Sequence, residues 1–136
     1  EVSNHAVLNA NYIKEKLKDV YHLPFTQHCM HESVFSASKQ VERGVHAVDI
    51  AKFLIDEGIH PPTVYFPLTV KESIMIEPTE TESKETMDTF IEAMKKADNL
   101  SKENPEAFAS LPKTTPITRP DEVKAAKEIN TNFFKK

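Results

Sequence analysis

The chain has 136 residues, a formal net charge of −4 and a hydrophobic content of 39%, values that suit one modest domain with a single core. Only two glycines occur, which excludes a glycine-rich phosphate loop, and the acidic balance argues against a nucleic-acid partner. A single cysteine excludes an internal disulfide and fits a reducing compartment, no apolar run reaches the length of a membrane span, and no signal peptide is visible.

A helix is expected first, over residues 3–22, with Ser3 or Asn4 as its N-cap. Its apolar side chains recur at a period of about 3.6 residues: Ala6, Ala10, Ile13, Leu17 and Val20. Asn9 and Asn11 interrupt the pattern with a mediocre helix former. They are interpreted either as solvent-exposed residues or as polar contacts with another part of a larger protein.

The next segment, residues 27–36, is expected to be a strand, and it contains His28, Cys29 and His31. Histidine and cysteine are zinc ligands, but a strand directs His28 and His31 to opposite faces. Cys29 and His31 would share a face, but two ligands do not make a site without a third and fourth, so we expect no metal site. These groups are interpreted as buried or interface polar groups, and nothing marks Cys29 as an activated nucleophile.

A polar loop over residues 37–45 and a helix over residues 46–57 are expected to follow. Gly58 lies where a left-handed C-terminal cap is expected. Asp49 belongs to the polar, outward-facing side of this helix, whose core stripe contains Ala47, Ile50, Ala51, Leu54 and Ile55.

Prolines then bracket two short apolar segments, residues 64–66 and residues 74–76. Both are expected to be strands. Pro67 limits the pairing of the first, which either lies at an edge of the sheet or ends before Pro67. The joint at Lys71-Glu72-Ser73 is compatible with a hairpin.

A second long helix is expected over residues 83–98, and two alternative caps precede it. Thr79 and Glu82 stand at the spacing of a capping box, and Ser83 is the alternative N-cap. A short helix at Asn104-Pro105 follows, because proline suits the first turn of a helix.

The C-terminal region is expected to be a proline-punctuated extended segment over residues 111–120, followed by a short helix over residues 121–130. The chain ends with two aromatic residues, Phe133 and Phe134, which are exposed unless they dock.

The order of these elements predicts an α+β fold, in which a small, mostly antiparallel sheet carries helices packed on one face. We divide the chain into an α+β domain over residues 1–100 and a C-terminal arm with short helices over residues 101–136.

Three acidic residues, Glu77, Glu80 and Glu82, crowd one turn of the chain. Paired carboxylates perform acid–base catalysis when the pKa of one is raised, whereas most acidic residues at helix starts serve capping and the helix dipole. His60 precedes two prolines, which favour extended backbone, and it is either a ligand-binding histidine or an ordinary surface residue. Both interpretations remain open for His60.

Two stretches together resemble a known family: Gly58-Ile59-His60-Pro61-Pro62-Thr63-Val64-Tyr65-Phe66-Pro67-Leu68 and Met75-Ile76-Glu77-Pro78-Thr79-Glu80-Thr81-Glu82-Ser83-Lys84-Glu85-Thr86. They look like the C-terminal part of decarboxylating glycine dehydrogenase, the P-protein of the glycine cleavage system, and most like the second subunit of the two-subunit bacterial form. Three further segments agree: residues 10–13, 29–32 and 49–52. The resemblance covers most of residues 4–125.

This resemblance implies a pyridoxal-phosphate enzyme of the aspartate-aminotransferase fold (fold type I), of which this chain resembles the small C-terminal domain. The full enzyme would decarboxylate glycine and pass the aminomethyl group to the lipoyl arm of H-protein, in the bacterial cytoplasm. The implied partners are the large cofactor-binding domain, a second P-protein subunit and lipoylated H-protein. Because the cofactor lysine would lie upstream of Glu1, we expect the chain to be a fragment that is inactive and free of cofactor when alone.

The resemblance also makes the proline-bracketed stretch the expected cleft-facing edge of the domain. The site candidates are His60, Thr63, Glu77, Thr79 and Glu80, with His31 as a cleft or interface candidate. No catalytic residue, cofactor ligand or metal ligand is expected within the chain. The alternatives are an independent ligand- or protein-binding module, the small domain of another fold type I enzyme, or a stand-alone hydrolytic site formed by Glu77, Glu80 and Glu82.

Overall fold

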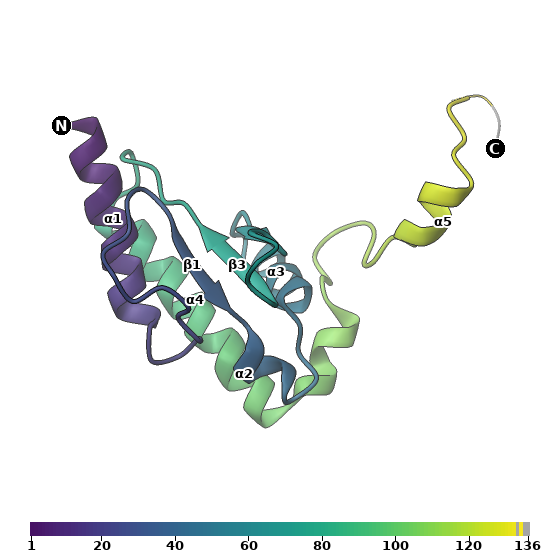
Figure 1. Cartoon of the computed structure of the whole chain (residues 1–136). Helices are drawn as coiled ribbons and strands as arrows, with labels where there is room; N and C mark the ends of the chain where they lie inside the picture. The colour runs from purple at the N-terminus through teal and green to yellow at the C-terminus, as the bar shows by residue number, and fades with distance from the viewer. Residues whose placement is uncertain (133, 135–136) are drawn as a thin grey trace.

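The computed structural model describes residues 1–132 and 134. The order of elements is α1 (Val2–Leu17), β1 (Ser33–Ser36), α2 (Ser38–Val41), α3 (Ala47–Asp56), β2 (Thr63–Val64), β3 (Ser73–Ile76), α4 (Lys84–Glu103), a 3₁₀ helix η1 (Pro105–Ser110) and α5 (Glu122–Lys127). The strands form an antiparallel sheet in the order β1-β3-β2, and α1, α3 and α4 lie on one side of it (Figure 1). The predicted α+β class is confirmed.

The pairing of β1 with β3 decides which side chains enter the core. Phe35 pairs with Ile74, and both are fully buried against the helices, as is most of Ile76. Val34 pairs with Met75 on the other face of the sheet, where both are only half-buried. This alternation matches a sheet with helices on one face.

Helix α1 begins earlier and ends sooner than its pattern predicts. Ser3 and Asn4 lie inside the helix, so neither is its cap, and the helix ends at Leu17. Tyr21 follows in a turn, with its amide donating to the Leu17 carbonyl at 3.1 Å. Its ring is fully buried and its hydroxyl donates to the Met94 carbonyl at 2.8 Å, so Tyr21 enters the core from the turn that follows the helix.

The predicted strand over residues 27–36 is wrong in its first half, because only β1 is extended. Side chains of α1 bind the backbone of the preceding loop. Asn11 Nδ2 donates to the Cys29 carbonyl at 2.7 Å, and the Cys29 amide donates to Asn11 Oδ1 at 3.1 Å. Lys14 Nζ donates to the carbonyls of Thr26, at 3.1 Å, and Gln27. With no strand at residues 28–31, their assignment to alternating faces fails as well.

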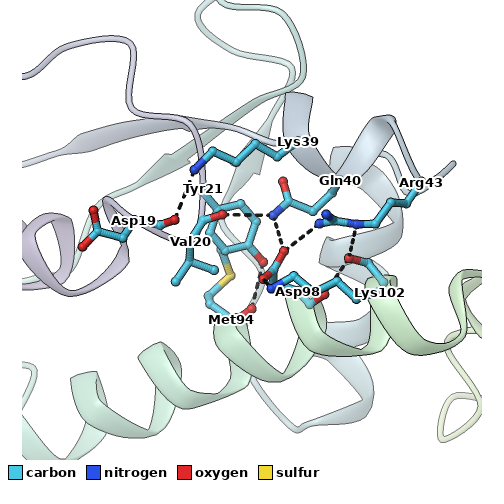
Figure 2. A network of polar contacts seen from close by, with 10 residues as sticks. Asp19, Val20, Tyr21, Lys39, Gln40, Arg43, Met94, Asp98 and Lys102 are labelled. Atoms are coloured by element: carbon cyan, nitrogen blue, oxygen red, sulfur yellow. Dashed lines mark hydrogen bonds and ion pairs between the residues drawn. The ribbon is translucent and has the colours of Figure 1, made fainter.

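The predicted loop over residues 37–45 contains a short helix, α2, which a buried carboxylate attaches to α4 (Figure 2). Asp98 Oδ1 accepts hydrogen bonds from Gln40 Nε2 and Arg43 Nη2, both at 2.7 Å. Lys102 Nζ lies 2.6 Å from Asp98 Oδ2. Gln40 and Arg43 are more than fifty residues from Asp98, so this helix depends on a tertiary contact that local propensity does not report.

Helix α3 confirms the prediction for residues 46–57 closely, with Gly58 in the left-handed conformation (φ +74°) just after its end. The prediction that Asp49 faces outward is wrong, because Asp49 is buried. Its Oδ2 accepts a hydrogen bond from the His46 amide at 2.8 Å, and its Oδ1 accepts one from Arg119 Nη2 at 2.7 Å.

Strand β2 ends earlier than predicted because Tyr65 adopts a positive φ of 59°. The expected hairpin forms, because β2 pairs with β3 in antiparallel register. Its connection is longer than residues 71–73, since Ser73 already belongs to β3 and the connection runs from Tyr65 to Glu72. Glu72 turns its carboxylate to the start of α3, where Oε2 accepts from the Ala47 amide at 2.9 Å.

Helix α4 uses the alternative cap: Ser83 Oγ accepts a hydrogen bond from the Thr86 amide at 3.1 Å. The helix continues five residues beyond the predicted end at Asp98, to Glu103. The predicted short helix at Asn104-Pro105 is confirmed as η1.

The C-terminal arm is attached to α3 before it leaves the body of the domain (Figure 1). Asp56 accepts hydrogen bonds from the amides of Lys113 and Thr114, at 2.8 and 2.9 Å. Arg119 reaches Asp49 at the other end of α3. The final predicted helix forms as α5, which has no buried residue. Phe134 is exposed, and the prediction for Phe133 lies outside the described residues.

The division of the chain after residue 100 stays a prediction. In the part of the chain that the structure describes, no helix combines the length and the apolar character that a membrane crossing requires.

Candidate functional site

A cavity of about 540 Å³ opens where the end of β3 meets the loop after α3 and the first turns of α4. Its apolar lining comes from three different elements: Ile13, Ile76, Met87 and Phe90. Its polar lining includes His60, Glu77 and Thr79. An apolar lining with a few polar groups is the usual composition of a ligand site.

The loop between β3 and α4 carries one side of the cavity, and α1 holds it in place. Asn9 Nδ2 donates to the carbonyl of Thr79 at 2.9 Å and to that of Glu82 at 3.4 Å. Within the loop, Pro78 is buried and the hydroxyls of Thr79 and Thr81 lie 2.7 Å apart. Asn9 is therefore neither solvent-exposed nor reserved for another part of a larger protein, because its partner lies in this chain.

His60 lines the cavity from a second segment, the one that follows α3. The left-handed Gly58 reverses the chain, and the Ile59 amide donates to the Leu54 carbonyl at 2.9 Å. Pro61 and Pro62 then restrict the backbone, and both line the cavity. The His60 side chain is exposed at this rim.

A second group of polar side chains shares Glu77 with the cavity. His31 Nε2 lies 3.6 Å from Glu77 Oε1, and one ligand atom from each of His31, Glu32 and Glu77 lies within 4.8 Å of the others. His31 and Glu77 are more than half exposed, at 57% and 56% of their side-chain surface. The pair is thus a surface contact between the loop before β1 and the end of β3.

The structure brings together four of the six site candidates. His60, Glu77 and Thr79 line the cavity, and His31 joins them through Glu77. Thr63 pairs with Met75, on the sheet face that the helices leave uncovered, and Glu80 is exposed outside the cavity lining. Of the three acidic residues that crowd this turn, Glu77 and Glu82 line the cavity and Glu80 does not, and all three are exposed.

Sequence reasoning did not single out Glu32 or Asn9 as parts of this region. Glu32 is marked in the sequence only by its position beside His31, within the resembling segment 29–32, and its proximity to Glu77 needs the register of β1 on β3. Asn9 was noticed as an unfavourable helix residue. Its role depends on a contact with a loop 70 residues away.

Cys29 does not provide a nucleophile near this site. Burial raises the pKa of the Cys29 thiol, and the charge of Lys14 opposes this only in part. A raised pKa reduces the thiolate fraction at neutral pH, and the thiolate is the reactive form.

A larger hollow of about 890 Å³ adjoins the cavity along α4, sharing Glu57, Ile59 and Thr89 with it. Several of its charged groups already form ion pairs with each other, as in Lys84–Asp88 at 2.5 Å and Lys96–Glu57 at 2.7 Å. It contains none of the predicted site residues. We therefore take the smaller cavity as the candidate site.

Comparison with known proteins relates the whole domain to one family. A family model described as "Glycine dehydrogenase, C-terminal domain" matches residues 2–111. The chain is 57% identical over 133 residues to the probable glycine dehydrogenase (decarboxylating) subunit 2 of Staphylococcus saprophyticus, covering 98% of this chain and 27% of that protein. The protein of the same name from Oceanobacillus iheyensis is 53% identical over 128 residues, which cover 94% of this chain and 26% of the relative.

The chain spans about a quarter of the length of the curated relatives it matches. Because the family model covers most of the chain and the identities exceed one half, the chain belongs to the family of glycine dehydrogenase C-terminal domains.

Proposed function

We propose that this chain serves as the C-terminal domain of a decarboxylating glycine dehydrogenase, the P-protein of a bacterial glycine cleavage system. In this proposal the full enzyme releases the carboxyl group of glycine as carbon dioxide and transfers the aminomethyl group to the lipoyl arm of H-protein. The observation that carries it is the family match over residues 2–111, together with relatives named as subunit 2 of that enzyme. We place the full enzyme in the cytoplasm and give it a second P-protein subunit as partner, as the family resemblance implies.

The cofactor of such an enzyme is pyridoxal phosphate, which stabilises negative charge on the substrate carbon when bound. The candidate cavity does not fit covalent attachment of this group, because no lysine is found among the described residues that line it. Lys14 is buried elsewhere, and its ammonium is bound to the carbonyls of Thr26 and Gln27. We therefore assign cofactor binding to a large domain outside this chain, with the aspartate-aminotransferase fold that the resemblance implies.

The chain's own contribution, in this proposal, is one wall of the substrate cleft. His60 and Thr79 offer hydrogen-bonding groups at the cavity rim, and the Glu77 carboxylate offers a negative charge. The apolar lining behind them leaves water few partners there. These residues would position a small polar ligand or the end of a carrier arm, while the covalent chemistry takes place on residues of the large domain.

The alternatives have less support. An independent binding module, or the small domain of a different fold type I enzyme, has no counterpart in the names of the relatives, which are those of a glycine dehydrogenase subunit. The hydrolytic alternative needs a carboxyl group that burial makes a general acid. Glu77 and Glu82 line the cavity and Glu80 does not, and all three side chains are exposed.

The proposal is tested with the full-length protein that contains this chain, co-expressed with its partner subunit and supplied with pyridoxal phosphate and lipoylated H-protein. Glycine labelled in its carboxyl carbon should release labelled carbon dioxide, and the release should depend on the lipoylated H-protein. Full cofactor occupancy without any release from glycine would overturn the proposal, and release from another amino acid in its place would favour a different fold type I enzyme.

A further inference from the structure

Two carboxylates face each other at one end of the β1–β3 ladder. Ser33 pairs with Ile76 in antiparallel register, so Glu32, just before β1, and Glu77, just after β3, are the next residues opposite one another. Like charges directly opposite on neighbouring strands repel each other. Among the described residues, Glu77 forms its ion pair with His31. Neither Glu77 nor Glu32 is paired with a lysine or an arginine there. The pair of carboxylates therefore lacks a fixed positive charge.

The imidazole of His31 completes a group of three ligand atoms. Its Nε2 lies 3.6 Å from Glu77 Oε1, and the three ligand atoms of His31, Glu32 and Glu77 all lie within 4.8 Å of one another. Bonds of about 2.0–2.2 Å to a tetrahedral ion would place neighbouring ligand atoms about 3.4 Å apart. The side chains of His31 and Glu77 are more than half exposed, so they can close this difference by rotamer changes while the paired strands remain in place.

We propose that His31, Glu32 and Glu77 form a binding site for a divalent transition-metal ion, with Zn²⁺ as its probe. One imidazole nitrogen with two carboxylate oxygens suits ions such as zinc, cobalt or manganese, whereas magnesium and calcium sites are built from oxygen ligands alone. Three protein ligands leave a fourth position for water or for a donor atom of another molecule. The third ligand, Glu77, lies just after β3 and more than forty residues after His31, so the segment around His31 alone contains too few ligands for a metal site.

Metal binding at this site is separate from the proposed function, because Zn²⁺ binding can be measured without glycine turnover. Zn²⁺ is titrated calorimetrically into the full-length protein, and circular dichroism verifies that each variant is folded. We expect saturable binding of one Zn²⁺ ion per chain. The affinity should be at least about tenfold weaker in both His31→Ala and Glu77→Gln, since loss of a residue that only supports a metal ligand already lowers the affinity by about 10- to 100-fold.

Two matched controls separate this site from adventitious surface binding. His28→Ala removes an exposed histidine three residues from His31, and Glu80→Gln removes an exposed carboxylate three residues from Glu77. Both should bind Zn²⁺ as tightly as the unaltered protein. Absence of saturable binding, or equal weakening by the control substitutions, would overturn the proposal, and neither result would bear on glycine decarboxylation.

Discussion

The side-chain amide of Asn9 donates a hydrogen bond to the main-chain carbonyl of Thr79, at 2.9 Å. This contact joins α1 to the loop whose polar residues Glu77, Thr79 and Glu82 line the candidate cavity. Asn9 is buried, and the same amide also reaches the Glu82 carbonyl at 3.4 Å. The position of Thr79 at the rim therefore depends on a residue at the other end of the domain's sequence.

Replacing Asn9 by alanine should loosen this loop. Asn4→Ala is the matched control, because Asn4 lies in the same helix but is exposed, so both substitutions gain the same helix propensity. We expect Asn9→Ala to be less stable than Asn4→Ala by about 1 kcal/mol, the net value of a typical hydrogen bond. Urea unfolding of the two variants measures the difference, and equal midpoints with equal slopes would show that the contact contributes nothing.

The buried carboxylate of Asp98 should be the most sensitive polar group of the α2–α4 contact (Figure 2). Asp98→Ala removes the charged acceptor shared by Gln40 and Arg43 and leaves only the Val20 carbonyl for Gln40 and the Ser101 hydroxyl for Arg43. Breaking a buried charged pair by removing one partner costs about 3–5 kcal/mol. Thermal or urea unfolding should show a loss in the lower part of that range, because Arg43 and Lys102 are partly exposed.

The control for Asp98 lies on the same helix. Glu92→Ala removes an exposed ion pair with Lys95, and exposed pairs are worth about 0–1 kcal/mol. A loss of stability in Asp98→Ala no larger than that in Glu92→Ala would contradict the role given to the Asp98 network.

The attachment of the C-terminal arm should weaken in acid. Hydrogen bonds from the Thr114 amide and hydroxyl and from the Lys113 amide hold the pKa of Asp56 below its ordinary value of 3.8. A carboxyl group whose pKa is lowered on folding stabilises the folded state above its unfolded pKa, and the contribution is lost as the pH falls through the folded value. The arm should therefore stay attached at neutral pH and loosen below about pH 4.

Hydrogen exchange measures this transition directly, because the amides of Lys113 and Thr114 are the donors. Their protection factors should fall together as Asp56 is protonated. In Asp56→Asn the side chain no longer titrates, so the same amides should show no such pH-dependent step. A step that persists in Asp56→Asn would assign the transition to another group.

Patterns within single elements predicted the parts of the fold that depend on local chemistry. The apolar stripe and Gly58 of α3, the Ser83 cap of α4 and the proline-started η1 all follow from neighbouring residues. The family resemblance supplied the domain assignment, which composition and periodicity alone do not give.

The mistaken expectations involve partners distant in sequence. Helix α2 depends on Asp98, the irregular loop at residues 27–32 depends on Asn11 and Lys14 of α1, and burial of Asp49 depends on Arg119. In each case a side chain satisfies backbone or charged groups from another element, and no short-range pattern reports it.

The residues of the candidate site likewise divide into those that the sequence identified and those whose position depends on the fold. His60, Glu77 and Thr79 were found because prolines and the resemblance mark their stretch, and the fold brings all three to one cavity. Thr63 and Glu80 belong to the same stretch but point elsewhere. The pairing of Thr63 with Met75 decides its face, and this register is known only once the strands are placed.

Comparing His60→Ala with His28→Ala in the full-length, cofactor-loaded enzyme tests most directly whether this cavity serves glycine decarboxylation. Both histidines are exposed, but only His60 lines the cavity, and neither belongs to the proposed metal site. We predict that kcat/KM for carbon dioxide release from glycine falls about tenfold in His60→Ala, a loss of about 1.4 kcal/mol of transition-state stabilisation, and stays within about twofold of the unaltered enzyme in His28→Ala. Equal rates for the two variants, at equal occupancy by pyridoxal phosphate, would contradict a role of this cavity in the reaction.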